Sequence, residues 1–289
     1  MILPNQKLCP KNPPSLQGPI RVWFDAPNFS DLERLYSYLD PGGHAQPRHC
    51  VARDRVAIII PYRDREMHLR TLLHNLHSLL TRQLLDYAIY VVEQLENETF
   101  NRAKLMNVGY AEAVKMYDWQ CFIFHDVDLL PEDDRNLYTC PEEPRHMSVA
   151  VDKFNYKLPY KTIFGGICAL TKEQYLKING FSNDFWGWGG EDDDIYRRVT
   201  MAGYQISRYP PEIARYRMIK HENEKGNSLN KCRYQLLTAT KEMWKKSGIS
   251  SLKYKLISLK TLPLFTHIKV SLNEEESRKQ LRREGFTKC

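Results

Sequence analysis

Apolar and polar positions alternate along the first half of the chain in a pattern that predicts parallel strands separated by helices. Residues 56–60 form an unbroken apolar run rich in β-branched side chains, which is typical of a strand buried on both faces. Leucines recur with helical spacing over residues 66–82. Residues 87–92 and 121–124 predict two more strands, and Asn101 is suited to cap the helix between them. This order predicts a doubly wound α/β sheet.

The pattern changes beyond residue 145, where the predicted elements become shorter. We expect strands and helices, in chain order, at 147–151, 163–170, 172–178, 192–201 and 233–246. The proline-rich residues 1–52 predict an irregular segment that wraps around one catalytic domain, residues 53–273. Residues 274–289 are highly charged and predict a solvated tail.

Candidate chemistry follows two of the predicted strands, at the edge where parallel sheets bind ligands. Arg63 and Arg65 come after the first strand, and guanidinium groups match phosphate geometry. Asp126 and Asp128 come after the third strand, where carboxylates would suit Mg²⁺ or Mn²⁺ shared with substrate phosphates. Asp-x-Asp is also common in turns, so the motif gains weight only from its position after a buried strand.

Residues 185–194 hold two tryptophans, three glycines and four consecutive acids. One or two of these acids are adequately explained as caps of the helix predicted from residue 192. Capping does not explain the whole run. Clustered glycines cost backbone entropy, and adjacent carboxylates repel one another, which raises the pKa of at least one of them. An aromatic, glycine-rich edge that leads into such carboxylates indicates a sugar-binding site with a catalytic base.

Composition narrows the class of ligand and of compartment. The formal net charge is +7, but the basic residues are scattered and no nucleic-acid-binding motif is present, which favours an anionic small substrate. No apolar run approaches the roughly 20 residues that span a bilayer, so any membrane attachment would use an anchor outside this sequence. Seven cysteines without a Cys-x-x-Cys pair, and sequons at Asn28 and Asn97, favour a secretory-pathway lumen.

The assembled motifs resemble those of the β-1,4-galactosyltransferases, including the invertebrate β-1,4-N-acetylgalactosaminyltransferases. The resemblance runs from Cys9 to about Val270 and rests on six motifs, which occupy residues 60–65, 100–104, 126–128, 164–166, 186–194 and 217–221. It implies a GT-A fold with a mostly parallel central sheet. It also implies an inverting, Mn²⁺-dependent transfer from a UDP-sugar to the 4-hydroxyl of a terminal N-acetylglucosamine (GlcNAc).

The resemblance assigns roles to residues of this chain. Asp192 would be the general base, with Glu191 beside it, and Asp128, Met218 and His221 would bind Mn²⁺. The nucleotide-sugar would contact Pro61, Tyr62, Arg63, Arg65, Phe100, Arg102, Asp126, Val127, Asp128, Lys153, Ile163, Gly166 and Trp188. The acceptor would contact Gly190, Asp192, Asp193, Arg233, Tyr234 and Leu237. Two disulfides are implied, Cys9–Cys50 and Cys121–Cys140, and the other three cysteines stay unassigned.

One departure from the family bears on the donor. Vertebrate galactosyltransferases carry a tyrosine before the Phe-Gly-Gly motif, whereas this chain carries Ile163. Isoleucine cannot make the tyrosine's hydrogen bond and should leave space for an acetamido group, as in the invertebrate members. The sequence therefore predicts UDP-GalNAc as the donor, with UDP-Gal as the alternative.

Two readings from other classes remain. A lectin-like protein could keep the fold without turnover, although it would not need the residues of a metal and UDP site. A nucleotide-sugar hydrolase would release UDP without an acceptor. The family resemblance places the protein in the Golgi lumen, as the catalytic part of a type II membrane protein.

Overall fold

A seven-stranded sheet forms the centre of the computed structural model, which describes residues 7–95, 98–220 and 227–289. Its strand order is β5-β7-β3-β1-β2-β10-β9. The strands are β1 (Arg55–Tyr62), β2 (Asp86–Gln94), β3 (Cys121–His125), β5 (Arg145–His146), β7 (Ile167–Thr171), β9 (Lys255–Thr261) and β10 (Thr266–Ser271). The four central strands β3, β1, β2 and β10 run parallel, and β5, β7 and β9 pair antiparallel.

Helices α2 (Glu66–Arg82) and α3 (Arg102–Met116) cover opposite faces of this sheet. Val56, Ile58 and Ile60 of β1 pack in one apolar cluster with the leucines of α2. Ala57 and Ile59 point to the other face and pack with α3. Because strand side chains alternate between faces, a continuous apolar run is what a strand between two helical layers requires. The predicted strands and helices of residues 55–125 are confirmed, including the Asn101 cap, which accepts from Lys104 N.

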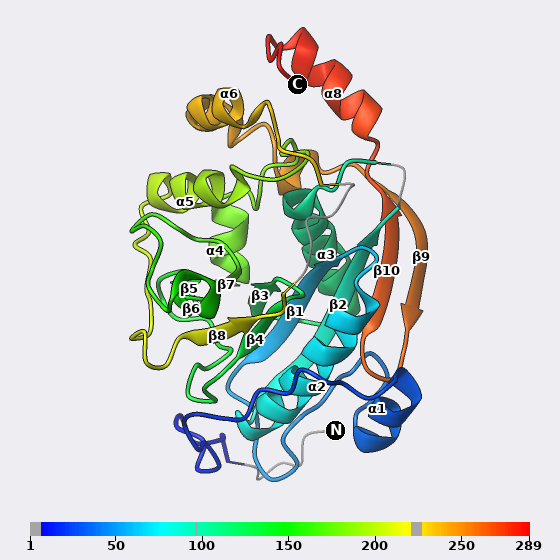
Figure 1. Cartoon of the computed structure of the whole chain (residues 1–289), viewed down its shortest axis with the longest axis vertical. Helices are drawn as coiled ribbons and strands as arrows, with labels where there is room; N and C mark the ends of the chain where they lie inside the picture. Colours follow the sequence, from blue (N-terminus) through cyan, green and yellow to red (C-terminus); the bar gives the residue numbers. More distant parts are fainter. Residues whose placement is uncertain (1–6, 96–97, 221–226) are drawn as a thin grey trace.

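The remaining elements lie around the sheet (Figure 1). A second, three-stranded sheet has the order β4-β8-β6. The other elements are α1 (Phe29–Leu35), β4 (Leu129–Pro131), β6 (Ala150–Val151), the 3₁₀ turns η1 (Asp152–Phe154) and η2 (Ile249–Ser251), α4 (Lys172–Lys177), α5 (Glu191–Met201), β8 (Arg215–Met218), α6 (Arg233–Thr238), α7 (Thr240–Met243) and α8 (Glu274–Arg283). None of the helices in the described ranges is long and apolar enough to cross a membrane.

Three predictions for the second half of the chain need correction. The strand predicted at 163–170 begins only at Ile167, because Gly166 adopts a positive φ of 70° and turns the chain. The strand predicted at 147–151 is replaced by β5 and β6, which belong to different sheets. The helix predicted at 233–246 is interrupted at Ala239, between α6 and α7.

The C-terminal residues also differ from the prediction. Residues 274–283 form helix α8, which extends beyond the sheet at the top of Figure 1. Leu281 and Phe286 are buried there, so this segment is an ordered, anchored helix rather than a free tail, although most of its charged side chains are exposed as expected.

Candidate active site

A cavity of about 560 Å³ lies where β1 and β3 end, at the edge expected from the sheet topology. It brings together residues from seven separate parts of the chain. Its lining is Pro61, Arg63, Arg65, Phe100, Arg102, Asp126, Val127, Asp128, Lys153, Gly187, Trp188, Glu191, Asp192, Met218, Asn227 and Leu229. Most of the predicted nucleotide-sugar residues thus face one space.

Arg102, at the start of α3, links the two acidic motifs of this cavity. Its Nε donates to Asp126 Oδ1 at 2.6 Å, and its Nη1 donates to Asp192 Oδ1 at 3.2 Å. Its Nη2 donates to the carbonyl of Gly166 at 3.2 Å. One guanidinium group therefore fixes three segments that are far apart in the sequence, and its positive charge is shared between two carboxylates.

The carboxylates of the cavity have perturbed acidities. Burial raises the pKa of Glu191 to about 8, with repulsion from Asp192 as the next cause. Burial raises the pKa of Asp126 to about 7, although the Arg102 charge opposes this. Burial also raises the pKa of Asp192, again against Arg102. Groups that titrate near neutrality are suited to proton transfer.

The Asp192 carboxylate has its place because residue 165 has no side chain. A Cβ atom built on Gly165 would lie 2.0 Å from Asp192 Oδ2, which is much closer than atoms can approach. Gly165 is thus a position beside the cavity that the sequence analysis did not single out. The Phe-Gly-Gly motif that contains it was the only signal, and the need for glycine at position 165 becomes visible only when Asp192 is seen beside it.

Asp128 and Met218 come together through the small sheet. Leu129 of β4 pairs with Met218 of β8, and Ile219 N donates to the carbonyl of Asp128 at 2.8 Å. Both side chains line the cavity. The third predicted ligand, His221, lies outside the described residues. Within the described ranges no three His, Cys, Asp or Glu side chains gather as a metal site, so the predicted ligand set depends on Met218 and His221.

The tryptophan segment forms one wall of the cavity by pairing with a second segment. Trp188 N donates to Ser228 O at 2.9 Å, and Asn230 N donates to Trp188 O at 3.0 Å. Gly187 N donates to Phe100 O at 2.9 Å. The Trp188 side chain itself is 64% exposed, so its indole is free to contact a ligand. Sequence reasoning missed Gly187, Asn227 and Leu229 as lining residues.

The predicted acceptor residues lie at or beside the start of α5, and of these only Asp192 lines the cavity. Arg233 of α6 approaches Gly190, where a Cβ would lie 3.1 Å from Arg233 Cβ. The Arg233 guanidinium lies over the ring of Tyr234, 4.5 Å from its centroid. Tyr234 is exposed and Leu237 is buried. Asp193 hydrogen-bonds Tyr160, whose pKa is raised by burial and by the nearby carboxylates.

Three other predicted contacts, Tyr62, Ile163 and Gly166, also lie outside the cavity lining. Gly166 still reaches the site through its carbonyl, which Arg102 binds. Ile163 is half-buried, and Arg208 Nη2 donates to its carbonyl at 2.8 Å. The loop before Gly165 is therefore held in place from outside the cavity.

Known proteins of similar sequence identify the family of this chain. The model for the N-terminal region of glycosyl transferase group 7 matches residues 9–141, and the model for the N-terminal domain of galactosyltransferase matches residues 145–222. Beta-1,4-galactosyltransferase 3 of Bos taurus is 51% identical over 269 residues, which cover 92% of this chain and 68% of that protein. The chain belongs to the β-1,4-galactosyltransferase family.

Other members of the β-1,4-galactosyltransferase family are also similar to this chain in sequence and in fold. Beta-1,4-galactosyltransferase 1 of Mus musculus is 48% identical over 265 residues, 91% of this chain and 66% of that protein. The catalytic domain of Drosophila beta-1,4-galactosyltransferase 7, solved with xylobiose, superposes with a TM-score of 0.61 at 30% identity, over 75% of this chain and 93% of that one. A mutant of it, solved with manganese, UDP-Gal and xylobiose, gives 0.62 at 28% identity.

These likenesses confirm the predicted GT-A fold and family. The chain is therefore an enzyme of the hexosyltransferase class, which removes the lectin reading. The structure also contains the disulfides Cys9–Cys50 and Cys121–Cys140, which the resemblance implied. It adds a third, Cys232–Cys289, and leaves Cys168 as a buried free thiol.

Only one of the two predicted glycosylation sequons lies in the described part of the chain. Asn28 is exposed and caps α1 by accepting from Asp31 N at 2.9 Å. Asn97 lies outside the described residues. Glycosylation at either position stays a prediction.

Proposed function

We propose that this enzyme transfers N-acetylgalactosamine from UDP-GalNAc to the 4-hydroxyl of a terminal GlcNAc, with inversion, to form a β-1,4 linkage. The observation that carries the proposal is the position of Asp192 in the cavity. Asp192 forms an ion pair with Arg102 and lines the same cavity as Asp128 and Met218. A candidate base and two candidate metal ligands thus line one cavity, where a hydroxyl activated by the base could attack a metal-bound UDP-sugar.

Asp192 is proposed as the general base. An acceptor hydroxyl must lose its proton as its oxygen attacks the anomeric carbon, and a carboxylate within hydrogen-bond reach can take that proton. Arg102 opposes protonation of Asp192 before the reaction, while burial makes the carboxylate a stronger base than in water. Glu191, with its pKa near 8, is proposed as a neighbouring proton reservoir in the same site.

The nucleotide is proposed to lie along the end of β1 and the start of α3. Arg63 is 5.1 Å from the ring centroid of Phe100 and donates to Glu98 O at 2.7 Å, so these residues form one ordered wall. Phe100 offers a planar face for the base. Arg65, Arg102 and Lys153 supply positive charge for the diphosphate, and Pro61, Tyr62 and Val127 complete the proposed contacts.

The chemistry of the three proposed metal ligands fits a manganese ion. Asp128 offers a hard carboxylate, whereas Met218 offers a soft thioether that Mg²⁺ would avoid, and His221 would add an imidazole. Mn²⁺ held there would neutralise charge on the leaving diphosphate. The Drosophila relative's complex with manganese and UDP-Gal supports this proposal.

The acceptor is proposed to bind between α5 and α6. Asp193 lies beside Tyr160, and Arg233 lies beside Gly190. Tyr234 and Leu237 would contact the N-acetyl group of GlcNAc, and Trp188 would close over the sugar. Xylobiose in the Drosophila complexes supports a sugar acceptor.

Two observations bear on the donor sugar, and they differ. Ile163 supports GalNAc, because its side chain has no hydroxyl and less bulk than a tyrosine. The names of the relatives support galactose, since all of those cited are galactosyltransferases. UDP-Gal is therefore the second candidate donor.

The test is a matrix of donors and acceptors assayed with Mn²⁺. We expect kcat/KM for UDP-GalNAc to exceed that for UDP-Gal on a GlcNAc-terminated acceptor, with little UDP released when no acceptor is present. A strong preference for UDP-Gal would replace GalNAc by galactose in the proposal. UDP release without acceptor would instead indicate a hydrolase.

A Golgi lumen location is proposed on similar grounds. Three disulfides are typical of an oxidising compartment.

A further inference from the structure

Helix α8 is joined to α6 by a small apolar cluster and a disulfide. Leu281 and Phe286 pack with Phe185, Leu236 and Leu237, apart from the two large clusters of the sheet. Cys289 is bonded to Cys232, the residue that precedes α6. Lys288 N also donates to Gln235 Oε1 at 3.1 Å. The two helices are thus coupled covalently and by packing.

Helix α6 is in turn held against α5, whose second residue is the proposed base Asp192. Thr240 Oγ1, just after α6, donates to Asp194 Oδ1 at 2.8 Å. Arg197 of α5 donates to the carbonyl of Leu237. With the close approach of Arg233 to Gly190, these contacts set the distance between the two helices.

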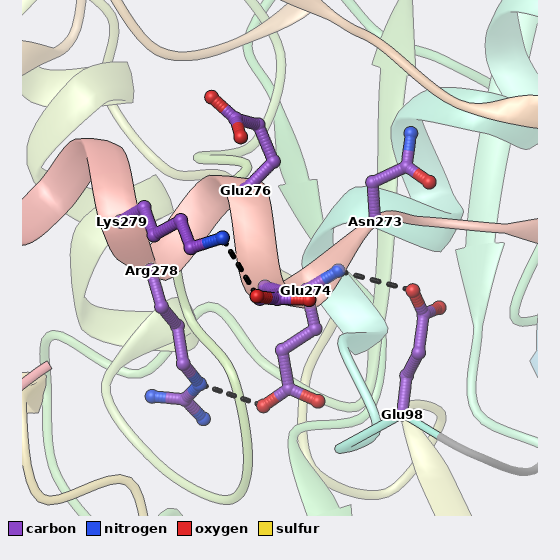
Figure 2. Close-up of a pocket in the computed structure, with 7 residues that line it drawn as sticks. Glu98, Asn273, Glu274, Glu276, Arg278 and Lys279 are labelled. Carbon is purple, nitrogen blue, oxygen red and sulfur yellow. Dashed lines mark hydrogen bonds and ion pairs between the residues drawn. The ribbon is translucent and has the colours of Figure 1, made fainter.

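The other end of α8 is fixed to the segment that leads into the cavity. Figure 2 shows the Glu98 carboxylate at the backbone of Glu274, which donates to it at 3.0 Å, and Arg278 turned onto the Glu274 side chain at 2.6 Å. One turn later, Trp186 Nε1 donates to Ser277 Oγ at 2.9 Å. Both ends of the helix therefore contact segments that carry site residues.

We propose that α8 and the Cys232–Cys289 disulfide form a brace that positions the acceptor site. The brace holds α6 against α5, so that Arg233, Tyr234 and Leu237 keep their places relative to Asp192. None of the brace residues lines the cavity, so their effect is exerted through α6. This inference rests on the proposed acceptor site, and it makes Leu281, Phe286 and Cys289 positioning residues.

The brace predicts a selective kinetic defect. Most of the proposed donor contacts lie at the end of β1, around the start of α3 and after β3, and the Cys232–Cys289 disulfide joins none of these segments. Loosening α6 should therefore weaken acceptor binding and leave donor binding as it is. A displacement of about 1 Å in a binding group costs on the order of tenfold or more in efficiency.

The experiment compares the full chain with its double variant Cys232→Ser/Cys289→Ser. We expect the KM for a GlcNAc-terminated acceptor to rise on the order of tenfold, with the KM for the UDP-sugar unchanged within about twofold. The matched control is Lys279→Ala, which removes an exposed ion pair with Glu275 on the same helix and should leave both constants unchanged.

Chemical reduction of the disulfide provides an independent test of the brace. Mild reductant should raise the acceptor KM of the wild type toward that of the double variant, and should not alter the double variant further. If the double variant fails to fold, as judged by calorimetric UDP binding, Leu281→Ala tests the same contact without removing a disulfide. An unchanged acceptor KM in a folded variant, or equal rises in donor and acceptor KM, overturns the brace.

Failure of the brace and failure of the proposed function have different signatures. If the wild type transfers no sugar to GlcNAc from either donor, the proposed function fails. If the wild type transfers sugar and the folded variants keep its acceptor KM, only the brace fails.

Discussion

Arg102 is the residue on which the charges of the site converge. It bonds Asp126 and Asp192 and also fixes the backbone at Gly166. Its guanidinium lies only 14% exposed, where an ion pair is stronger than on the surface. The acidities of the nearby carboxylates are therefore set by a balance between burial and this one charge.

The role of Asp192 is tested by Asp192→Asn. We expect turnover to fall by about 10²–10⁴-fold, because the amide cannot accept the proton. Binding of UDP with Mn²⁺ should persist, since Asp192 is not a proposed ligand of either. Calorimetry that showed loss of UDP binding would contradict the assignment.

Gly165→Ala tests whether the space beside Asp192 matters. The added methyl group would displace the carboxylate, so we expect kcat to fall by on the order of 100-fold. The control is the double variant Gly165→Ala/Asp192→Asn. It should be no slower than Asp192→Asn alone, because both changes act on the same group. A fully additive loss would show that Gly165 acts elsewhere.

Ile163→Tyr tests the proposed donor preference. The larger side chain with its hydroxyl should shift the ratio of kcat/KM toward UDP-Gal by about tenfold or more, as for other single-group changes in a pocket. Ile163→Leu keeps the apolar character and the size, so it serves as the control. If all three proteins show the same donor ratio, residue 163 does not select the donor.

At the scale of elements, α5 divides the work of its four acids. Glu191 and Asp192 face the cavity, and Asp193 meets Tyr160. Asp194 points inward, where it pairs with Arg198 at 2.6 Å and accepts from Thr240. The sequence analysis expected some of these acids to support the helix, and only the helical phase separates Asp194 from the others.

The buried pair within α5 predicts a large effect on stability. Asp194→Ala should lower the free energy of unfolding by about 3–5 kcal/mol, because it leaves the Arg198 charge buried without its partner. Denaturant unfolding measures this change. Glu275→Ala in α8 removes an exposed i,i+4 pair with Lys279 and should change stability by less than about 1 kcal/mol. Similar losses in both variants would contradict the argument.

The elements that sequence predicted well share a physical cause. Helix α2 and strand β1 have periodic or continuous apolar faces, which local sequence displays directly. The loop before β7 was predicted as strand because its residues are apolar. Its true path depends on Arg208 and Asp192, which come later in the chain. Local patterns cannot report such contacts.

At the scale of the whole molecule, we propose that residues 1–52 act as a wrapping segment around a catalytic domain of residues 53–273, followed by a charged C-terminal part. Cys9–Cys50 closes this segment on itself, and Trp23 N donates to Asn75 Oδ1 of α2 at 3.0 Å. None of the described residues of this segment, 7–52, lines the cavity. The segment should therefore contribute to stability and not to chemistry.

The double variant Cys9→Ala/Cys50→Ala tests whether the N-terminal segment serves stability and not chemistry. Loss of a disulfide across 41 residues should lower the free energy of unfolding by about 2–4 kcal/mol, by releasing the unfolded chain. The KM values for donor and acceptor should not change. A large change in kinetics with unaltered stability would show that the segment shapes the site.

The sequence by itself determined three central strands of the sheet, its two covering helices and the identity of most cavity residues. Apolar periodicity and short motifs are local, so they can be read without the fold. The tertiary structure decided which charges meet at Arg102, why residue 165 must be glycine and that α8 is bonded to α6. These depend on contacts between residues from 24 to 90 positions apart, and only packing of the whole chain selects them.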